Sequence, residues 1–298
     1  MELSIIIVAY NSKKYIYECI NSIIESNIKV EFEISIVDNS PNNETMEVIN
    51  TIVDKYKNNK IKVIRCENKG FNHANNIGIR NSTGKYIMLL NPDTIVKNNQ
   101  INKLLFKAKE ITNLGAIGPR VLTKNEEYNI TRIFYPSVKD GILRLLNIRN
   151  QKSALLSRKE GLIRVDSPTG AAYMFKREII QEIGYLDENY FLYFDEMDFS
   201  KRMDKIGKKN YVYTGSEIIH YQGVITSELN DYMYDINMKS YVRFLNKNYS
   251  SINRNFIKII FIVENLVKYI IFSMFKKERS LYYKKSINNF IKCKDVIK

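Results

Sequence analysis

Short apolar runs that alternate with segments of helical pattern fill the first 90 residues and most restrict the possible fold. The runs are rich in β-branched residues and span 3–8, 34–37, 61–65 and 86–90. Such runs are typical of strands buried on both faces. The segments between them carry apolar residues at helical spacing and span 12–25, 45–56 and 73–80. Strand alternating with helix predicts right-handed crossovers, and hence an α/β fold with a mostly parallel central sheet flanked by helices.

The second half of the chain changes in composition twice. After an irregular basic stretch at 120–164, a strand, two helices and a short strand are predicted at 171–175, 176–183, 194–206 and 211–213. Glycines directly follow both helices, as is usual for helix ends. Beyond about residue 228 the sequence becomes helical, basic and aromatic. We therefore expect a domain at 1–227, with halves 1–119 and 120–227, and a helical basic tail at 228–298.

Length and charge narrow the class of protein. A chain of 298 residues with 45% hydrophobic content can form one large domain of roughly 200–250 residues plus a tail. Lys and Arg outnumber Asp and Glu by 46 to 32, which favours an anionic partner such as phosphate, nucleic acid or an acidic lipid surface. Three widely separated cysteines predict neither a disulfide framework nor a zinc site. The first residues lack the features of a secretory signal, so we expect a cytoplasmic protein.

Polar side chains follow the predicted strands, at the edge where open parallel sheets bind ligands. Because neither a G-x-G-x-x-G nor a P-loop sequence occurs, a diphosphate would be held through a divalent ion on a carboxylate. Asp93 is placed for that role, Asp38 for accepting a hydrogen bond from a base, and Tyr10 for stacking on it. The alternatives are a turn with a helix cap at Asp93, an Asx-turn at Asp38 and an ordinary half-buried tyrosine.

The ordered motifs resemble glycosyltransferase family 2, which has the GT-A fold, and especially its rhamnosyltransferase-like branch. The resemblance covers about residues 1–227 and rests on LSIIIVAYNS, IVDNS, NKGFNHANNIG, LLNPDT, RIFYPS, GAAYMFKR, GYLDE, YFDEMDF and IHYQG. It implies a nucleotide and donor site made of Ala9, Tyr10, Asn11, Asp38, Gly70, Phe71, Asn76, Asn91 and Asp93. It also implies a Mg²⁺ or Mn²⁺ ion bound by Asp93, with His220 completing the site. The alternative for His220 is a histidine at a strand end whose hydrogen bonds are satisfied within the protein.

The resemblance implies that the acidic segment at 195–198 supplies the catalytic base. An inverting transfer needs a carboxylate that takes the proton of the acceptor hydroxyl, and Glu196 is the expected base with Asp195 beside it. The alternatives concern its neighbours, since Asp195 could cap the helix and Asp198 could pair with Arg202. Three positions depart from the family pattern: Asn91 replaces the usual first acid of the metal motif, Ala9 replaces a small hydroxylated residue, and the paired acids run Asp-Glu.

The tail has the composition of a helix on an anionic surface. The stretch 255–275 is long enough to span a membrane, but its charges make spanning unfavourable. Aromatic residues and isoleucines mixed with lysines suit peripheral contact with the inner face of the cell membrane, to which the basic stretch 143–158 could add. The alternative is a helical tail that packs on its own domain or on a second subunit as a homo-oligomer.

The leading hypothesis is therefore an inverting, metal-dependent glycosyltransferase. It would move a sugar, rhamnose being one candidate, from a UDP- or dTDP-sugar to a lipid-linked or cell-surface glycan. One alternative is a non-catalytic basic protein that binds nucleotides or membranes, and another is a sugar nucleotidyltransferase. No nucleic-acid partner is expected.

Overall fold

A computed structural model describes residues 1–56, 60–129, 132–145, 159–221 and 230–292. The chain divides into two compact units. Unit 1 comprises Met1–Ile133 and Ser157–Glu228, and unit 2 comprises Phe134–Leu156 and Leu229–Lys298. Each unit has its own buried core, so each is described by itself.

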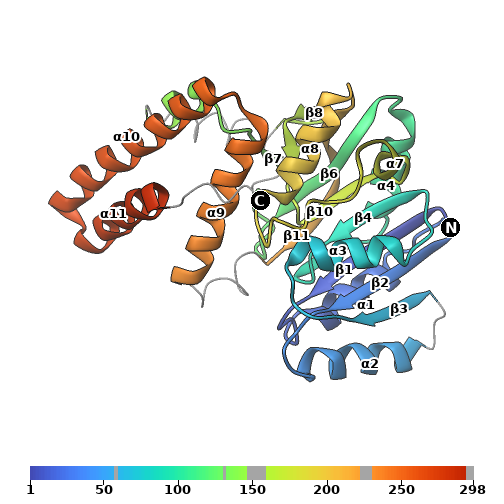
Figure 1. Ribbon diagram of the computed structural model, residues 1–298. Helices are drawn as coiled ribbons and strands as arrows, with labels where there is room; N and C mark the ends of the chain where they lie inside the picture. Colours follow the sequence, from blue (N-terminus) through green and yellow to red (C-terminus); the bar gives the residue numbers. More distant parts are fainter. Residues whose placement is uncertain (57–59, 130–131, 146–158, 222–229, 293–298) are drawn as a thin grey trace. The chain divides into compact units, whose positions relative to one another are not determined.

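Unit 1 is built on a central sheet whose first part is the expected parallel arrangement (Figure 1). Its strands lie in the order β3-β2-β1-β4 and span β1 (Leu3–Ala9), β2 (Phe32–Asp38), β3 (Ile61–Arg65) and β4 (Tyr86–Leu90). All three pairings among them are parallel. The alternating strand and helix pattern thus correctly predicted this half of the sheet.

The other half of the sheet is mixed. It continues from β4 through β10 (Ala172–Lys176), β6 (Leu114–Leu122), β11 (Lys209–His220) and β5 (Thr94–Val96), with β8 (Leu162–Val165) also pairing β11. Strand β10 runs antiparallel to both of its neighbours. The short strand expected at 211–213 is in fact 12 residues long, because its alternation of buried and half-buried residues continues to His220. A separate small sheet pairs β7 (Arg132–Ile133) with β9 (Ser167–Pro168).

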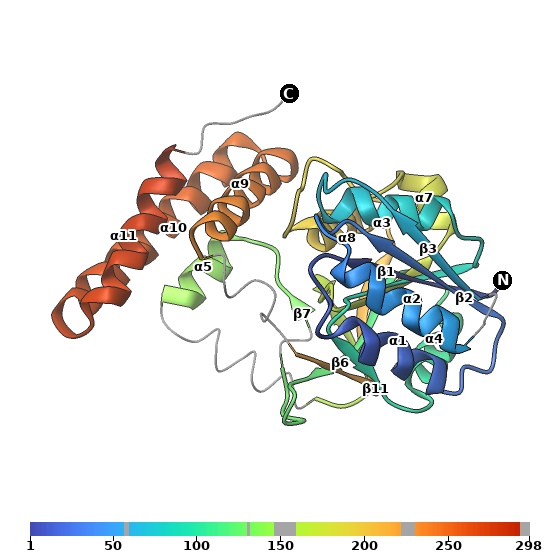
Figure 2. The ribbon, with the colours of Figure 1, turned by 90° about the horizontal axis from the view of Figure 1, so that it is seen from below.

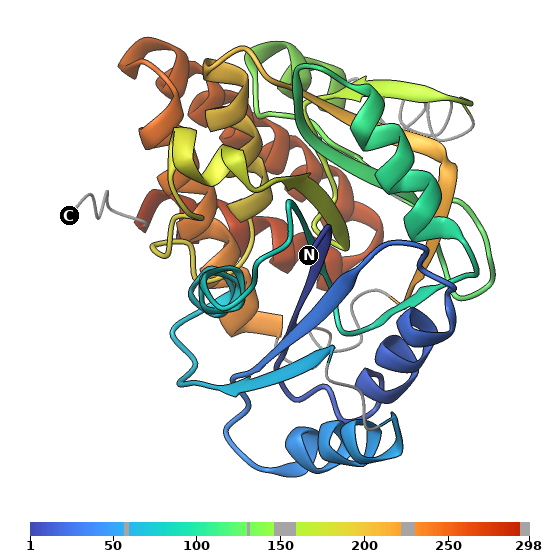
Figure 3. The same cartoon turned by 90° about the vertical axis from the view of Figure 1, so that its right-hand side faces the viewer.

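Helices cover both faces of the sheet, which gives three layers (Figure 3). One core places α1 (Ile16–Glu25), α2 (Glu44–Tyr56) and α4 (Gln100–Glu110) against one face. A second core places α3 (Phe71–Arg80), α7 (Glu178–Ile183) and α8 (Asp195–Lys205) against the other. Successive side chains of a strand point to opposite faces, so Ile5 and Ile7 of β1 join the first core and Ile6 joins the second.

Two antiparallel pairings bring distant segments to the carboxyl edge of β4. In the β5–β11 pair, His220 lies opposite Thr94, next to the predicted metal ligand. In the β10–β4 pair, Ala172 lies opposite Leu90, and the backbone N–H of Asn91 donates to the carbonyl of Ala171 at 3.0 Å. Both the end of β11 and the start of β10 therefore meet the turn that follows β4.

Unit 2 is helical. It contains α5 (Val138–Leu145), α9 (Asn230–Asn248), α10 (Ser251–Phe275) and α11 (Lys277–Lys292), with α5 and α11 both packed on α10 (Figure 2). Arg144 of α5 donates to the buried carboxylate of Glu264 on α10 at 2.9 Å. The helices approach so closely that a Cβ on Gly141 would lie 2.3 Å from the Ile260 side chain.

This packing corrects one predicted boundary. The segment 134–145 was expected in the acceptor half of the first domain, but it belongs to the same unit as the C-terminal helices. The buried ion pair and the close helix contact are the physical reason, and neither can be read from sequence spacing. Most of the basic stretch predicted at 143–158 lies outside the described residues. Within the described part of the chain, none of the helices combines the length and apolar character needed to cross a membrane.

Candidate functional site

A pocket of about 670 Å³ opens at the carboxyl ends of β1, β2 and β3. Its lining residues come from the three segments that follow these strands, and are Tyr10, Asn39, Ser40, Pro41, Arg65, Cys66, Glu67 and Asn68. Backbone hydrogen bonds hold the segments together, since Asn39 N–H donates to the Ala9 carbonyl and Cys66 N–H to the Asp38 carbonyl, each at 3.0 Å. A planar ligand entering this pocket would meet the Tyr10 ring and the side chains of Asn39 and Asn68.

Asp38 directly precedes the lining residues Asn39 and Ser40 and has unused hydrogen-bonding capacity. Its side chain is fully buried, and its Oδ1 accepts a hydrogen bond from the Ser40 backbone N–H at 3.1 Å. Its Oδ2 has no partner among the described residues, and neither has the buried Oδ1 of Asn39. Buried acceptors without partners are costly. The Asp38 carboxylate therefore forms the Asx-turn through Oδ1, and its Oδ2 is an acceptor without a partner among the described residues.

The other residues predicted for the nucleotide and donor site are distributed differently. Ala9 is buried in the first core, and its carbonyl is used by Asn39. Asn11 lines a neighbouring pocket of about 660 Å³ that also contains Lys13 and Lys14. Phe71 packs on Val8, Val37 and Ala74. Of these predicted residues, Tyr10 lines the first pocket and Asp38 is buried next to its lining residues Asn39 and Ser40, whereas Ala9 and Phe71 have packing roles.

Gly70 is required by a close backbone approach. It caps α3 with φ 109°, and a Cβ there would lie 2.9 Å from the Phe191 backbone. The next residue, Phe71, donates its backbone N–H to the Phe191 carbonyl at 2.7 Å. The start of α3 is thus joined directly to the segment that precedes α8.

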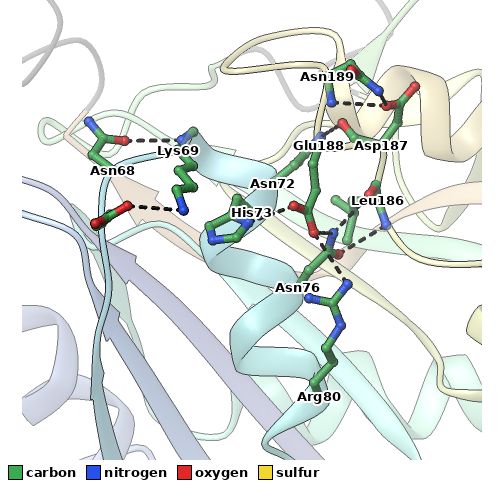
Figure 4. A network of polar contacts seen from close by, with 12 residues as sticks. Asn68, Lys69, Asn72, His73, Asn76, Arg80, Leu186, Asp187, Glu188 and Asn189 are labelled. Atoms are coloured by element: carbon green, nitrogen blue, oxygen red, sulfur yellow. Dashed lines mark hydrogen bonds and ion pairs between the residues drawn. The ribbon is translucent and has the colours of Figure 1, made fainter.

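Asn76 belongs to a network that joins α3 to the segment 186–189 (Figure 4). Its side chain is fully buried, donates to the Leu186 carbonyl at 2.9 Å and to Glu188 Oε1 at 2.8 Å, and accepts from Leu186 N–H at 3.2 Å. The other carboxylate oxygen of Glu188 lies 2.6 Å from His73 Nδ1. The prediction that Asn76 lines the donor site is corrected, because the backbone of Leu186 and Glu188 use both ends of its amide.

The same segment is fixed to α8 on its other side. The Tyr190 hydroxyl, fully buried, donates to Asp198 at 3.3 Å. Arg202 donates to Asp198 at 3.1 Å and to the carbonyls of Ile183 and Tyr185 at 2.7 and 2.8 Å. The predicted Asp198–Arg202 pair is therefore confirmed. We call residues 183–191 with these contacts the α3–α8 brace.

Asp93 and His220 converge at the edge of the sheet. Asp93 Oδ1 lies 3.1 Å from His220 Nε2, and both side chains are largely buried. The Asn91 side-chain nitrogen lies 3.4 Å from the same imidazole nitrogen. Tyr221 N–H donates to the Asp93 carbonyl at 3.0 Å, which continues the β5–β11 pairing and fixes the separation of the two side chains.

These donors fit a divalent cation that also binds phosphate. Two neighbouring ligands of an octahedral ion at about 2.1 Å are about 3 Å apart, and Asp93 Oδ1 and His220 Nε2 are 3.1 Å apart. The described residues contain no group of three or more His, Cys, Asp and Glu side chains arranged for a metal. Mg²⁺ typically binds one or two carboxylates and takes its remaining ligands from phosphate and water. Asp93 and His220 would therefore hold the ion only together with an anionic ligand.

Asp195 and Glu196 form a carboxyl pair in the first turn of α8. The helix follows Tyr193 and Phe194, whose φ values of 67° and 62° are unusual for aromatic residues. Phe194, not Asp195, occupies the N-cap position, so the capping alternative for Asp195 is wrong. Desolvation, the nearby Asp195 charge and a hydrogen bond that protonated Glu196 donates to Asp195 raise the pKa of Glu196 well above its ordinary value. Desolvation also raises the pKa of Asp195.

The acid pair lies near the turn that follows β4. A Cβ on Gly170 would be 3.6 Å from the Glu196 carboxyl carbon, so the Glu196 carboxyl group packs on the Gly170 backbone. The following residue, Ala171, accepts the hydrogen bond from Asn91. Three residues of backbone, 170–172, thus connect the environment of Glu196 with that of Asn91.

Sequence reasoning missed Arg65 and Cys66 in the pocket and Glu188 in the brace. The pocket residues had a usable signal, since they end β3 and therefore reach the same edge as Asp38. Glu188 stands in the GYLDE motif that carried part of the resemblance. Its contacts join residues more than 100 positions apart in the chain, and no spacing rule predicts such contacts.

Comparison with protein families gives a match to glycosyl transferase family 2 over residues 4–184. The low-salt glycan biosynthesis hexosyltransferase Agl10 of Haloferax volcanii is 28% identical over 205 residues, which cover 67% of this chain and 61% of that protein. A Methanococcus voltae dolichyl N-acetyl-alpha-D-glucosaminyl phosphate 3-beta-D-2,3-diacetamido-2,3-dideoxy-beta-D-glucuronosyltransferase is 25% identical, covering 73% of this chain and 65% of its own length. The chain thus spans less than two thirds of these two relatives.

Solved structures share the fold. Residues 1–349 of S. aureus TarS give a TM-score of 0.57 at 17% identity, covering 98% of this chain and 81% of that one. GalNAc-T7, crystallised with UDP, GalNAc and Mn²⁺, gives a TM-score of 0.61 at 18% identity, covering 83% of this chain and 48% of that one. The α/β sheet flanked by helices is therefore the expected GT-A fold.

Proposed function

Because the chain belongs to glycosyl transferase family 2, we propose that it transfers a sugar from a UDP- or dTDP-sugar to a glycan, with inversion at the anomeric carbon and with a divalent cation. The observation that carries this proposal is the convergence of Asp93 and His220 at 3.1 Å on the edge of the sheet that also holds Asp38. One edge thereby offers a base pocket and a pair of cation ligands.

Asp38 and Tyr10 would bind the pyrimidine base. The imide N–H of uracil or thymine can donate to the unpartnered Oδ2 of Asp38, while the Tyr10 ring stacks on the base. Cytosine has no proton on the corresponding ring nitrogen, so the same carboxylate disfavours it. This pairing would satisfy a buried acceptor that the described protein groups leave without a partner.

Asp93 and His220 would hold Mg²⁺ or Mn²⁺ against the diphosphate. The bound cation would supply electrostatic stabilisation of the negative charge that develops on the nucleoside diphosphate as it leaves. Asn91 replaces the usual first acid of this motif, and its amide lies against His220 rather than adding a second carboxylate.

Glu196 would act as the general base. Its carboxylate would accept the proton of the acceptor hydroxyl while that oxygen bonds to the anomeric carbon and the bond from this carbon to the diphosphate breaks. Asp195 is a positioning residue, because its carboxylate accepts a hydrogen bond from protonated Glu196 and thereby raises the pKa of Glu196. A base with a raised pKa has a stronger affinity for the proton that it must remove.

The acceptor in this proposal is a lipid-linked or cell-surface glycan, and rhamnose is one candidate for the sugar. Support comes from relatives whose names describe glycan biosynthesis and a dolichyl phosphate acceptor. A lipid-linked acceptor requires work at a membrane surface. Peripheral association with the inner face of the cell membrane is therefore part of the proposal.

The experiment measures release of UDP or dTDP from a panel of nucleotide-sugars by the purified chain. We expect turnover with Mg²⁺ or Mn²⁺ and none in EDTA, and we expect Asp93→Ala to lower the rate at least about 100-fold, because cation binding contributes several kcal/mol to the transition state. Asp54→Ala, which removes an exposed aspartate on α2, is the matched control and should leave the rate unchanged. Full turnover in EDTA, or by a folded Asp93→Ala variant, would contradict the proposal.

A further inference from the structure

Helix α10 is apolar on two opposite sides. One side packs within unit 2, where Ile257 and Asn265 are buried and Phe261 contacts Tyr241 and Phe290. The other side carries large apolar residues three, four or seven positions apart, each 42% to 73% exposed: Ile252, Phe256, Ile259, Val263, Ile270 and Met274. We call this exposed set the α10 stripe. The apolar face of a helix normally packs against another surface.

The α10 stripe contains no charged residue. An α-helix turns by about 100° per residue, which places Arg254, Lys258, Glu264 and Lys268 about 100° or more from the centre line of the stripe. Glu264 is also buried, where it pairs with Arg144 and Lys268. With a rise of 1.5 Å per residue, the stripe is about 35 Å long. Continuous exposed apolar surfaces of this size mark interaction sites in soluble proteins.

The net positive charge of the surrounding unit favours an anionic partner for the α10 stripe over a second copy of the chain. Residues 229–298 contain 14 Lys and Arg against 5 Asp and Glu, a net charge of +9 out of +14 for the whole chain. A second copy of this unit would bring like charges together, whereas an anionic surface is complementary. Exposed lysines of this unit include Lys276, just beyond the end of α10, and Lys284 on α11.

We propose that the α10 stripe docks on an anionic lipid bilayer. The helix would lie parallel to the surface, with Phe256 and Met274 among the side chains at the boundary between headgroups and acyl chains, while the net positive charge of the unit attracts it to the anionic headgroups. The proposal does not depend on sugar transfer, because it uses only residues of unit 2.

The first test is co-sedimentation of the full chain with vesicles of phosphatidylcholine alone or with about 30% phosphatidylglycerol. We expect binding to the anionic vesicles and weaker binding to neutral ones or in high salt. The triple variant Phe256→Ser, Ile259→Ser, Ile270→Ser should lower partitioning at least about 100-fold, because each side chain loses its transfer out of water. Phe106→Ser is the matched control, since Phe106 is 66% exposed on α4 in unit 1.

The second test removes charge without changing the stripe. Lys276→Gln with Lys284→Gln should weaken binding to anionic vesicles by about fivefold per charge and leave binding to neutral vesicles unchanged. Lys29→Gln with Lys85→Gln is the matched control on unit 1, where both lysines are exposed.

Three outcomes would overturn the proposal. The triple variant could bind vesicles as the wild type does, or the wild type could fail to bind anionic vesicles. Alternatively, sedimentation without lipid could show a dimer that the triple variant abolishes, in which case a second copy covers the stripe. Circular dichroism confirms folding of each variant, and turnover with a water-soluble acceptor reports the active site separately, so failure of the lipid proposal is distinguishable from failure of the proposed transfer.

Discussion

At the scale of single residues, the acids of α8 differ in what surrounds them. Asp198 is fixed by Tyr190 and Arg202, and it belongs to the brace. Asp195 and Glu196 instead share a desolvated site with each other, and both have raised pKa values. Titratable groups with perturbed pKa values cluster at functional sites. This difference in environment supports Glu196 as the base more strongly than sequence spacing did.

The pH dependence of transfer tests this carboxyl pair. Glu196 accepts a proton only when it is ionised, so the rate should rise with pH through its raised pKa, above the range of an ordinary glutamate. Asp195→Asn removes a charge that raises the pKa of Glu196, so the acidic limb of the profile should shift to lower pH. Glu196→Gln should abolish transfer at every pH. An acidic limb that Asp195→Asn leaves in place would contradict the assignment.

The same pair has a predictable effect on stability. A carboxyl group whose pKa is raised in the folded state keeps its proton where the unfolded chain has lost it, so the free energy of unfolding decreases as pH rises above the ordinary range. Glu196→Gln should therefore stabilise the protein at pH 8. A gain of about 1 kcal/mol corresponds to about 2–4 °C in Tm for a domain of this size. The gain should shrink at pH 4, where both states bind the proton.

At the scale of elements, the α3–α8 brace joins α3 to the helix that carries the acid pair. Asn72 donates to the Asp187 carbonyl at 2.9 Å, and Asn76 and Phe71 hold Leu186 and Phe191. The contacts on α8 come from Tyr190 and Arg202. Because the brace fixes α8 relative to α3, changes within it should affect catalysis without touching substrate.

Glu188 is the residue through which the brace is best tested. Glu188→Ala removes an acceptor from Asn76 and from His73, which costs about 1 kcal/mol of stability, and should lower kcat about tenfold with little change in the KM for donor. Glu188→Gln retains an acceptor for Asn76 and should recover much of kcat. Glu182→Ala is the control, because Glu182 lies on α7 and forms a similarly exposed ion pair with Lys208. An unchanged kcat for Glu188→Ala would show that the brace is structural only.

At the scale of the whole molecule, the proposed base pocket, the proposed cation ligands and the acid pair all lie in unit 1. Unit 2 holds its own core and the α10 stripe. This division assigns the chemistry and the proposed membrane contact to separate parts of the chain. Ligand binding and lipid binding should therefore be separable by mutation.

Thermal unfolding with ligands tests the assembled site. A ligand that binds only the folded state raises stability by about 2.7 kcal/mol at 100 times its Kd, so UDP or dTDP with Mn²⁺ should raise Tm, and either alone should raise it less. Asp93→Asn should remove the effect of Mn²⁺, and Asp38→Ala should weaken the effect of the nucleotide. CDP with Mn²⁺ is the control nucleotide, because it keeps the diphosphate while cytosine offers no ring N–H to Asp38. Equal protection by CDP and UDP would contradict the base assignment.

The sequence by itself determined the local and periodic features. Apolar β-branched runs specified β1 to β4, apolar spacing and glycines specified α1, α2, α3, α7 and α8, and strand ends located Tyr10, Asp38 and Asp93. These follow from short-range sterics and from the burial of one face of each element. The composition change near residue 228 likewise predicted a basic helical tail.

Only the tertiary structure decided which distant groups meet. The antiparallel pairing of β5 with β11 brings His220 to Asp93, and that of β10 with β4 brings Gly170, with Glu196 packed on it, to the same edge. The buried contacts of Asn76 place it in the α3–α8 brace, and those of Arg144 place it in unit 2. Such contacts depend on strand register and packing between segments far apart in the chain, and local sequence patterns do not encode them.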